Sequence, residues 1–132
     1  MGRNMLVADD SPAIRAVITD ALQESGIREE DIATAENGEQ AVEKYQEVDP
    51  EIIFMDLNMP RKNGCEAAEE ILTQNPRAHV VAVTGLREDK EIVEEIRSVG
   101  AFDILQKPLR FQDIKDVLNR VREERRGADR IP

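Results

Sequence analysis

Five short apolar runs, each followed by a segment with helical spacing, constrain the fold of this chain more than any other feature. The runs lie at residues 5–8, 32–35, 52–55 and 80–83, and at Ile104 with Leu105. Most of them are continuous rather than alternating, a pattern typical of parallel strands that are buried on both faces. The repeated strand–helix order predicts an α/β fold in which helices cover both faces of a five-stranded parallel sheet.

Two of the expected helices have clear boundaries. The first is predicted to begin at a Ser11 cap, with Pro12 in its first turn, and to end at Gly26, in keeping with the residue preferences of helix ends. The last carries an apolar stripe from Phe111 onward and is predicted to end at Gly127, because glycine commonly follows the last helical residue. Weaker helical patterns are expected at residues 38–47, 64–75 and 89–99.

Length and charge limit the domain count and the partners. A chain of 132 residues is expected to form one domain, residues 1–126, followed by a short C-terminal tail at 127–132. The 28 acidic and 18 basic residues give a net charge of −10, which disfavours direct binding to nucleic acid or to anionic lipid. Only 3% of the residues are aromatic, which weakens roles that require bases to stack on rings.

Cysteine and histidine each occur once, as Cys65 and His79. A single cysteine excludes an intrachain disulfide and fits a reducing compartment, so a cytoplasmic location is expected. A single histidine excludes a zinc site with two histidine ligands. The first apolar run is too short for a signal peptide or a membrane span, so no membrane insertion is expected. Chemistry on this chain is therefore expected to use carboxylates, hydroxyls and lysine.

Polar residues follow the apolar runs at the points where the strands are expected to end. Asp9 and Asp10 follow the first run, Asp56 ends the third, Thr84 ends the fourth, and Lys107 follows the fifth. The carboxyl ends of parallel strands meet at one edge of the sheet, where ligands of such folds bind. Three carboxylates at that edge repel one another unless a hard divalent cation joins them. Mg²⁺ is the predicted cation, and Mn²⁺ is a possible substitute.

Asp56 is the candidate nucleophile of this cluster. It ends the central apolar run by itself, whereas Asp9 and Asp10 are adjacent and better placed to hold a metal together. A carboxylate can attack phosphorus when Mg²⁺ and an ammonium group such as that of Lys107 neutralise the phosphoryl oxygens. Thr84 could donate a hydrogen bond to the incoming phosphoryl group. The expected product is an aspartyl phosphate.

These residues resemble the receiver domains of two-component response regulators, the CheY-like superfamily. The resemblance covers residues 4–126 and includes the segment Met55-Asp56-Leu57-Asn58-Met59-Pro60, Gly64, Thr84-Gly85 and Lys107-Pro108. It implies a flavodoxin-like (βα)5 fold with the strand order 2-1-3-4-5. It also implies a signalling module that catalyses only its own phosphorylation and dephosphorylation, and not an enzyme with turnover on small molecules.

The resemblance assigns partners and metal ligands. A sensor histidine kinase or a phosphotransfer protein would donate the phosphoryl group of its phosphohistidine to Asp56. Asp10, Asp56 and the backbone carbonyl of Asn58 would bind Mg²⁺, with Asp9 acting largely through water. Thr84 and Lys107 would bind the phosphoryl oxygens.

Two further features concern the peptide after Lys107 and the output of the signal. The resemblance also implies that the Lys107–Pro108 peptide is cis, a state that proline makes accessible. Ile104 occupies the position, three residues before Lys107, at which receivers usually carry a Tyr or Phe switch. An aliphatic side chain cannot swing a ring in and out, which puts aromatic gating in doubt. Phe102, two positions earlier, is predicted to lie on the same face of the strand, further from the site.

The output surface is expected on the fourth helix, the fifth strand and the fifth helix. Its candidate residues are Glu91, Glu95, Arg97, Gln106 and Arg110. Through this surface the protein would bind a downstream target protein, acting as a monomer or as a weak homodimer. The chain ends soon after the last helix, which favours a stand-alone single-domain regulator. The alternative is a receiver excised from a longer transcriptional or enzymatic response regulator.

Two other classes of protein agree less well with these residues. A haloacid-dehalogenase-like phosphatase also uses an aspartate nucleophile and Mg²⁺, but it needs a second aspartate two residues after the nucleophile. That position is Asn58, which cannot transfer protons. A flavin-binding protein with this fold would have to place the flavin phosphate beside three acidic residues, which repel it.

Overall fold

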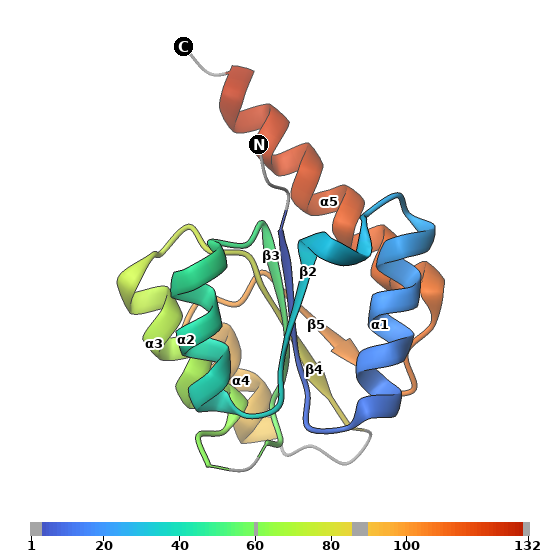
Figure 1. The fold of residues 1–132 in the computed structure, drawn as a ribbon. Coiled ribbons are helices and arrows are strands. Elements are labelled where there is room, and N and C mark those ends of the chain that lie inside the picture. The colour runs from blue at the N-terminus through green and yellow to red at the C-terminus, as the bar shows by residue number, and fades with distance from the viewer. Residues whose placement is uncertain (1–3, 60, 86–89, 131–132) are drawn as a thin grey trace.

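The computed structural model describes residues 4–59, 61–85 and 90–130. Five parallel strands form one sheet in the order β2-β1-β3-β4-β5, seen in Figure 1. They are β1 (Met5–Ala8), β2 (Ile32–Ala35), β3 (Ile52–Asp56), β4 (Val80–Thr84) and β5 (Asp103–Gln106). Every neighbouring pair is parallel. The predicted α/β class and the strand order implied by the resemblance are both confirmed.

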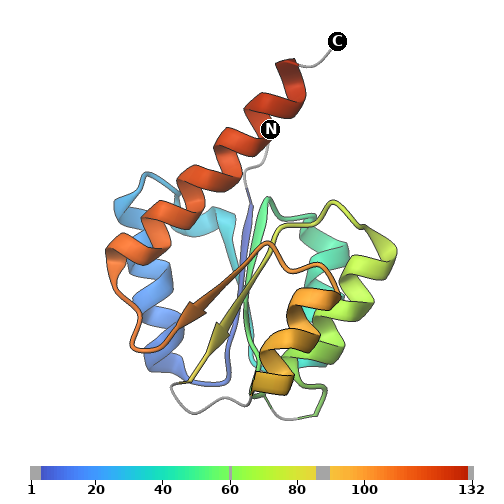
Figure 2. The ribbon, with the colours of Figure 1, turned by 180° about the vertical axis from the view of Figure 1, so that it is seen from behind.

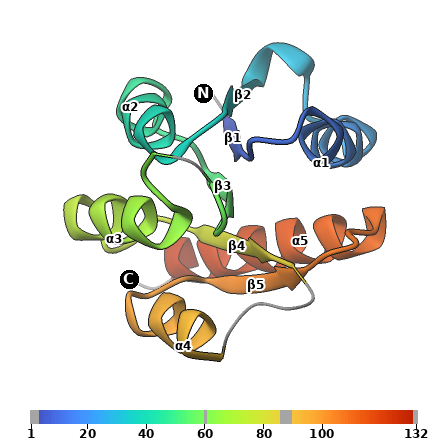
Figure 3. The same cartoon turned by 90° about the horizontal axis from the view of Figure 1, so that it is seen from below.

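Helices cover both faces of this sheet, as the end-on view of Figure 3 shows. One layer contains α1 (Pro12–Glu24) and α5 (Phe111–Arg130), and the other contains α2 (Gly38–Val48), α3 (Gly64–Gln74) and α4 (Lys90–Ser98). A short 3₁₀ helix at Glu29–Asp31 precedes β2. Figure 2 shows the same two layers from behind. Residue 89, where the fourth helix was expected to begin, lies outside the described residues.

Alternating side chains of the central strands build two apolar cores, one on each face of the sheet. Met5, Val7 and Phe54 pack against α1 and α5, while Leu6 and Met55 pack against α2, α3 and α4. All five side chains are fully buried. Burial of this kind contributes roughly 2 kcal/mol per large aliphatic side chain. The central strands therefore form a rigid base from which the residues after them project.

The starts of α1 and α3 are fixed by side-chain caps close to the carboxyl edge of the sheet. The Ile14 N–H donates to the Ser11 hydroxyl at 3.3 Å, which confirms the predicted cap of α1. Asn63 and Glu66 form a reciprocal capping box at the start of α3. Such caps typically contribute about 1 kcal/mol each. They fix the two helices that begin beside the predicted site.

The last helix is longer than the sequence predicted. It runs from Phe111 to Arg130 and does not end at Gly127. Glycine ends a helix when it takes a positive φ, and among the described glycines only Gly26 and Gly100 have one. In a helical conformation glycine costs only about 1 kcal/mol relative to alanine, so a run of good helix formers continues through it. Figure 1 shows the end of α5 extending away from the sheet.

Among the described residues, no helix combines the length and apolar character needed to cross a membrane.

Candidate functional site

The carboxyl edge of the sheet brings together the residues that the sequence singled out. Asp9 and Asp10 follow β1 and Asp56 ends β3, while Thr84 ends β4 beside Gln106 of β5. One carboxylate oxygen from each aspartate lies within 4.8 Å of the other two. The backbone N–H of Lys107 donates to the Thr84 carbonyl at 2.7 Å. Parallel strand order alone therefore places three carboxylates, a hydroxyl and an ammonium group at one edge.

Asp56 lies in the centre of this cluster, with 3% of its surface exposed. Its Oδ1 atom accepts the Asn58 N–H at 3.2 Å and lies 3.6 Å from Lys107 Nζ. The pKa of Asp56 is raised to about 6, chiefly by burial and also by the nearby charges of Asp9 and Asp10, and this value includes the lowering effects of the Asn58 N–H and of Lys107. Without a further cation this carboxyl therefore keeps its proton to a higher pH than an ordinary aspartate does.

Asp9 is the most buried carboxylate of the cluster, with 1% exposed. Its Oδ1 atom accepts the Ser11 N–H at 2.8 Å, and Arg15 donates to its backbone carbonyl at 2.7 Å. Its Oδ2 atom lies 3.5 Å from Lys107 Nζ and has no hydrogen-bond partner in the described part of the chain. A buried carboxylate oxygen without a hydrogen bond costs free energy, so this atom is poised to bind a cation.

The donor set suits a hard divalent cation. Three carboxylates converge from two neighbouring strands, Asp10 is exposed to solvent, and Asp9 Oδ2 is available. Carboxylate oxygens with room for water are the ligands that Mg²⁺ prefers. The Asn58 N–H faces Asp56; a role for the Asn58 carbonyl remains a prediction.

Thr84 ends β4 and Lys107 follows β5, the two strands on the side of β3 away from β1. Thr84 is 4% exposed, and its hydroxyl donates to the carbonyl of the next residue, Gly85, at 3.2 Å. The Lys107–Pro108 peptide is cis, as expected. Lys107 Nζ lies almost equally far from Asp9 and Asp56, at 3.5 and 3.6 Å. One ammonium group is thus shared between two buried carboxylates.

Gly64 has a structural role at the site that the sequence motif did not reveal. A Cβ atom on Gly64 would lie 2.1 Å from the Asp56 carbonyl oxygen and 2.6 Å from the Leu57 Cα atom. Both are backbone atoms, so they cannot rotate away. Only glycine lets the start of α3 contact the end of β3. The sequence signal was a glycine at a helix start, but its reason required coordinates.

The prediction for Phe102 was wrong. Ile104 packs against the core beside α2, α3 and α4, whereas Phe102 packs against the core beside α1 and α5. The alternation rule fails because β5 begins only at Asp103. The Phe102 ring makes an edge contact with His79 at 5.2 Å, and the Arg120 guanidinium lies 5.7 Å from its centroid. Phe102 therefore cannot replace the aromatic switch that Ile104 lacks.

The predicted output residues lie on the surface of α4, β5 and the start of α5. All five side chains, Glu91, Glu95, Arg97, Gln106 and Arg110, are exposed. Arg110 forms an ion pair with Asp113 at 3.4 Å. Their exposure is compatible with binding a partner, and their role in output stays a prediction.

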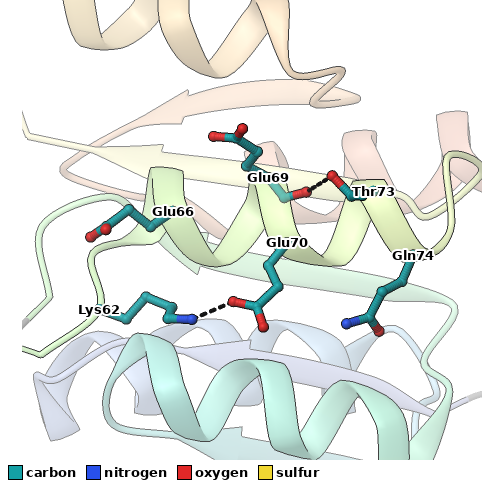
Figure 4. A pocket seen from close by; sticks show the side chains of 6 residues that line it. All are labelled: Lys62, Glu66, Glu69, Glu70, Thr73 and Gln74. Carbon is teal, nitrogen blue, oxygen red and sulfur yellow. Dashed lines mark hydrogen bonds and ion pairs between the residues drawn. The ribbon is translucent and has the colours of Figure 1, made fainter.

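A groove of about 450 Å³ runs along α3, apart from the aspartate cluster. Figure 4 shows its lining side chains, with Lys62 paired to Glu70. The lining residues are Lys62, Glu66, Glu69, Glu70, Thr73 and Gln74. None of them contributes to the cluster at the carboxyl edge.

Comparisons with known proteins agree with this geometry. The family model of the response regulator receiver domain matches residues 5–119. The chemotaxis protein CheY of Thermotoga maritima is 34% identical over 121 residues, which are 92% of this chain and 98% of that protein. The solved receiver domain of AraT, a response regulator from Geobacillus stearothermophilus, has a TM-score of 0.87 at 27% identity, covering 98% of this chain and 100% of that one.

A longer relative is also similar. The protein-glutamate methylesterase/protein-glutamine glutaminase of Halobacterium salinarum is 37% identical over 103 residues, which are 78% of this chain but 29% of that protein. With the family model, the CheY relative and the fold in agreement, this chain belongs to the response regulator receiver domain family and is a CheY-like signalling module of two-component systems.

Proposed function

We propose that this receiver accepts a phosphoryl group on Asp56. The observation that carries the proposal is the convergence of Asp9, Asp10 and Asp56 around the ammonium group of Lys107 at one sheet edge. A carboxylate oxygen of Asp56 forms the new bond to phosphorus, while the bond between phosphorus and the imidazole nitrogen of the donor phosphohistidine breaks. The ammonium group of Lys107 stabilises the charge on the transferred oxygens.

Asp9, Asp10 and Asp56 would hold Mg²⁺, with the Asn58 carbonyl as a further ligand. When bound, Mg²⁺ supplies positive charge that neutralises both the carboxylates and the phosphoryl oxygens. Burial and like charge raise the pKa of Asp56 to about 6, so a second cation beside Lys107 keeps the nucleophile ionised. Mn²⁺ has similar ligand preferences and would substitute.

Thr84 would carry the signal away from Asp56. Its hydroxyl now donates to Gly85, and a phosphoryl oxygen on Asp56 would be a stronger, charged acceptor. Rotation of Thr84 toward that oxygen would shift the equilibrium between conformations of the output surface. This surface consists of Glu91, Glu95, Arg97, Gln106 and Arg110. Ile104 packs against the core beneath this surface and would respond by repacking rather than by a ring flip.

The proposed partners are a sensor histidine kinase or phosphotransfer protein as donor and a downstream protein as target. We propose a stand-alone regulator that works in the cytoplasm, without direct DNA binding, as a monomer or weak homodimer through α4, β5 and α5. The CheY relative, of which this chain covers 98%, supports the stand-alone part of this proposal. The alternative, a receiver within a longer regulator, draws support from the methylesterase relative, of which this chain covers only 29%.

Intact mass spectrometry after incubation with acetyl phosphate tests the proposal. We expect one phosphoryl adduct that requires Mg²⁺ and is lost in Asp56→Asn. Glu51→Gln is the matched control, because it neutralises a buried carboxylate at the opposite end of β3 and should keep the adduct. An adduct that survives in Asp56→Asn, or none in the folded wild type with Mg²⁺, would refute Asp56 as acceptor.

A further inference from the structure

The first turn of α2 lies directly against the segment that leads into α3. A Cβ atom on Gly38, the first residue of α2, would lie 1.9 Å from the Lys62 carbonyl oxygen and 2.6 Å from its carbonyl carbon. Contacts of a real Cβ atom essentially never fall below 3.0 Å. The contacted atoms belong to the backbone, so no side-chain rotation relieves the overlap. Any other residue at position 38 therefore requires the backbone of α2 or of the Lys62 segment to shift.

The contacted segment reaches the acceptor aspartate two residues later. Gly64 lies against the Asp56 carbonyl, where a Cβ atom would lie 2.1 Å from the oxygen, and its N–H donates to the Leu57 carbonyl at 3.2 Å. Asn63, between the two contacts, is fixed by its capping box. The segment from Lys62 to Gly64 is thus held between α2 on one side and the end of β3 on the other.

Two ion pairs with partly exposed side chains also join this segment to α2 and α3. Lys62 pairs with Glu70 of α3, as Figure 4 shows. Arg61 Nη1 lies 3.4 Å from Glu39 Oε2, beside Gly38 on α2. Arg61 has a positive φ of 67°, a conformation that non-glycine residues adopt only when their surroundings hold it. A displacement of Lys62 would therefore be passed on toward Gly64 rather than absorbed locally.

We propose that Gly38 is a positioning residue for the acceptor. Because it has no side chain, the Lys62 carbonyl can lie against α2. This contact fixes the position of the segment from Lys62 to Gly64 and, through it, the position of Asp56 in the carboxylate cluster. This rests on the proposed function for its consequence in phosphorylation. Its consequence for cation binding depends only on the cluster geometry. A carboxylate displaced by a fraction of an ångström loses its place among the metal donors, and supporting residues of this kind commonly change metal affinity 10- to 100-fold.

The test compares Gly38→Ala with Gly26→Ala. Gly26 is a matched control because its φ of +98° makes alanine strained, whereas nothing lies within 4 Å of the added Cβ atom. Gly26→Ala therefore destabilises the fold without pressing on the site. Two readouts are taken at equal folded fraction: the Kd for Mg²⁺ by calorimetric titration, and the rate of adduct formation with acetyl phosphate at saturating Mg²⁺ by intact mass.

We expect Gly38→Ala to weaken Mg²⁺ binding roughly tenfold and to slow adduct formation, while Gly26→Ala stays within about twofold of wild type on both readouts. Equal Mg²⁺ affinity in Gly38→Ala and wild type, or equal impairment of the two variants, overturns the proposal. Sucrose keeps a destabilised variant folded; a Gly38→Ala protein that stays unfolded in sucrose also overturns it, in favour of a purely structural role. If wild type forms no adduct, the proposed function fails, and the Mg²⁺ affinities still decide the role of Gly38.

Discussion

The two ends of β3 place a buried carboxylate at opposite edges of the same sheet. Asp56 ends the strand and is 3% exposed, and Glu51 precedes its first residue and is 6% exposed. Glu51 lies 3.7 Å from the Arg122 Nε atom of α5, so it has a cation of its own. Asp56 shares Lys107 with Asp9, and Asp10 adds a third negative charge. The two carboxylates are thus similarly buried, but Glu51 forms a neutral pair with its cation, whereas Asp56 lies in a cluster with net negative charge.

This difference separates an edge that stabilises the fold from the edge that holds the proposed site. At the amino edge a cation from α5 balances the buried carboxylate, which ties the helix to the sheet. At the carboxyl edge the negative charge exceeds the local positive charge, which costs stability in the free protein. A cation that binds there reduces the repulsion between the carboxylates, so cation binding should stabilise the folded protein. The following predictions either break this contrast or sharpen it.

The largest expected effect is stabilisation by Mg²⁺, which should act through the carboxyl edge alone. At a concentration 100-fold above its Kd, a ligand that binds only the folded state adds about 2.7 kcal/mol to the free energy of unfolding. Urea unfolding with and without Mg²⁺ measures this gain. We expect Asp56→Asn to lose most of it and Arg122→Met, at the other edge, to keep it. Equal gains in Asp56→Asn and wild type would contradict the assignment of the site.

The next effect is the loss of the balancing cation at the amino edge. Arg122→Met should lower the free energy of unfolding by about 2 kcal/mol, because it removes the guanidinium facing a buried carboxylate. The value is below that of fully buried pairs, since 26% of the Arg122 side chain is exposed. Urea unfolding of the single variants and of the double variant with Glu51→Gln isolates the pair. Additive losses would show that the two side chains are not coupled.

Neutralising a charge at the carboxyl edge should have the opposite sign. Asp10→Asn removes one of three converging carboxylates and should raise the free energy of unfolding, in the absence of Mg²⁺, by about 0.5 to 1 kcal/mol. The effect is small because Asp10 is exposed and its charge is screened. The same variant should bind Mg²⁺ more weakly, which calorimetric titration measures. A loss of stability without Mg²⁺ would show that repulsion does not dominate this edge.

The sequence predicted the elements that depend on local pattern. Continuous apolar runs located all five strands to within one residue, and Ser11 with Pro12 located the start of α1, because these signals act over a few residues. Strand order places Asp56 and Lys107 at one edge, so the cluster too could be predicted. The prediction that the last helix ends at Gly127 was wrong, because a glycine that ends a helix is recognised by its φ angle and not by its identity.

Contacts between distant segments could not be read from the sequence. The buried pair of Glu51 and Arg122 joins the start of β3 to α5, and its two residues are 71 positions apart in the numbering. Gly38, the first residue of α2, lies against Lys62 in the loop before α3. Phe102 was assigned to the wrong face because it precedes the first residue of β5, where the alternation of a strand does not apply. Each of these depends on packing geometry, for which composition and periodicity carry no signal.

The last expected effect is a pH dependence that distinguishes the two edges. The pKa of Asp56 is raised from 3.8 to about 6, chiefly by burial. A carboxyl whose pKa is higher in the folded state favours folding when protonated. Its contribution is therefore fully present below pH 3.8 and is lost as the pH rises through about 6. Without Mg²⁺, the free energy of unfolding should then gain a favourable contribution from Asp56 as the pH falls from 7.5 to 5.

Comparison with Asp56→Asn isolates this contribution, because both proteins keep His79 and every other titrating group. Urea unfolding across that pH range should give a steeper rise toward low pH for wild type than for Asp56→Asn. Saturating Mg²⁺ should remove or reverse the difference, because a bound cation requires the ionised carboxylate. Glu51→Gln should leave the difference unchanged, since the carboxylate of Glu51 is balanced by Arg122 at the other edge. Parallel pH profiles for wild type and Asp56→Asn would show that burial of Asp56 does not strain the free protein, and the contrast between the two edges would then rest on cation binding alone.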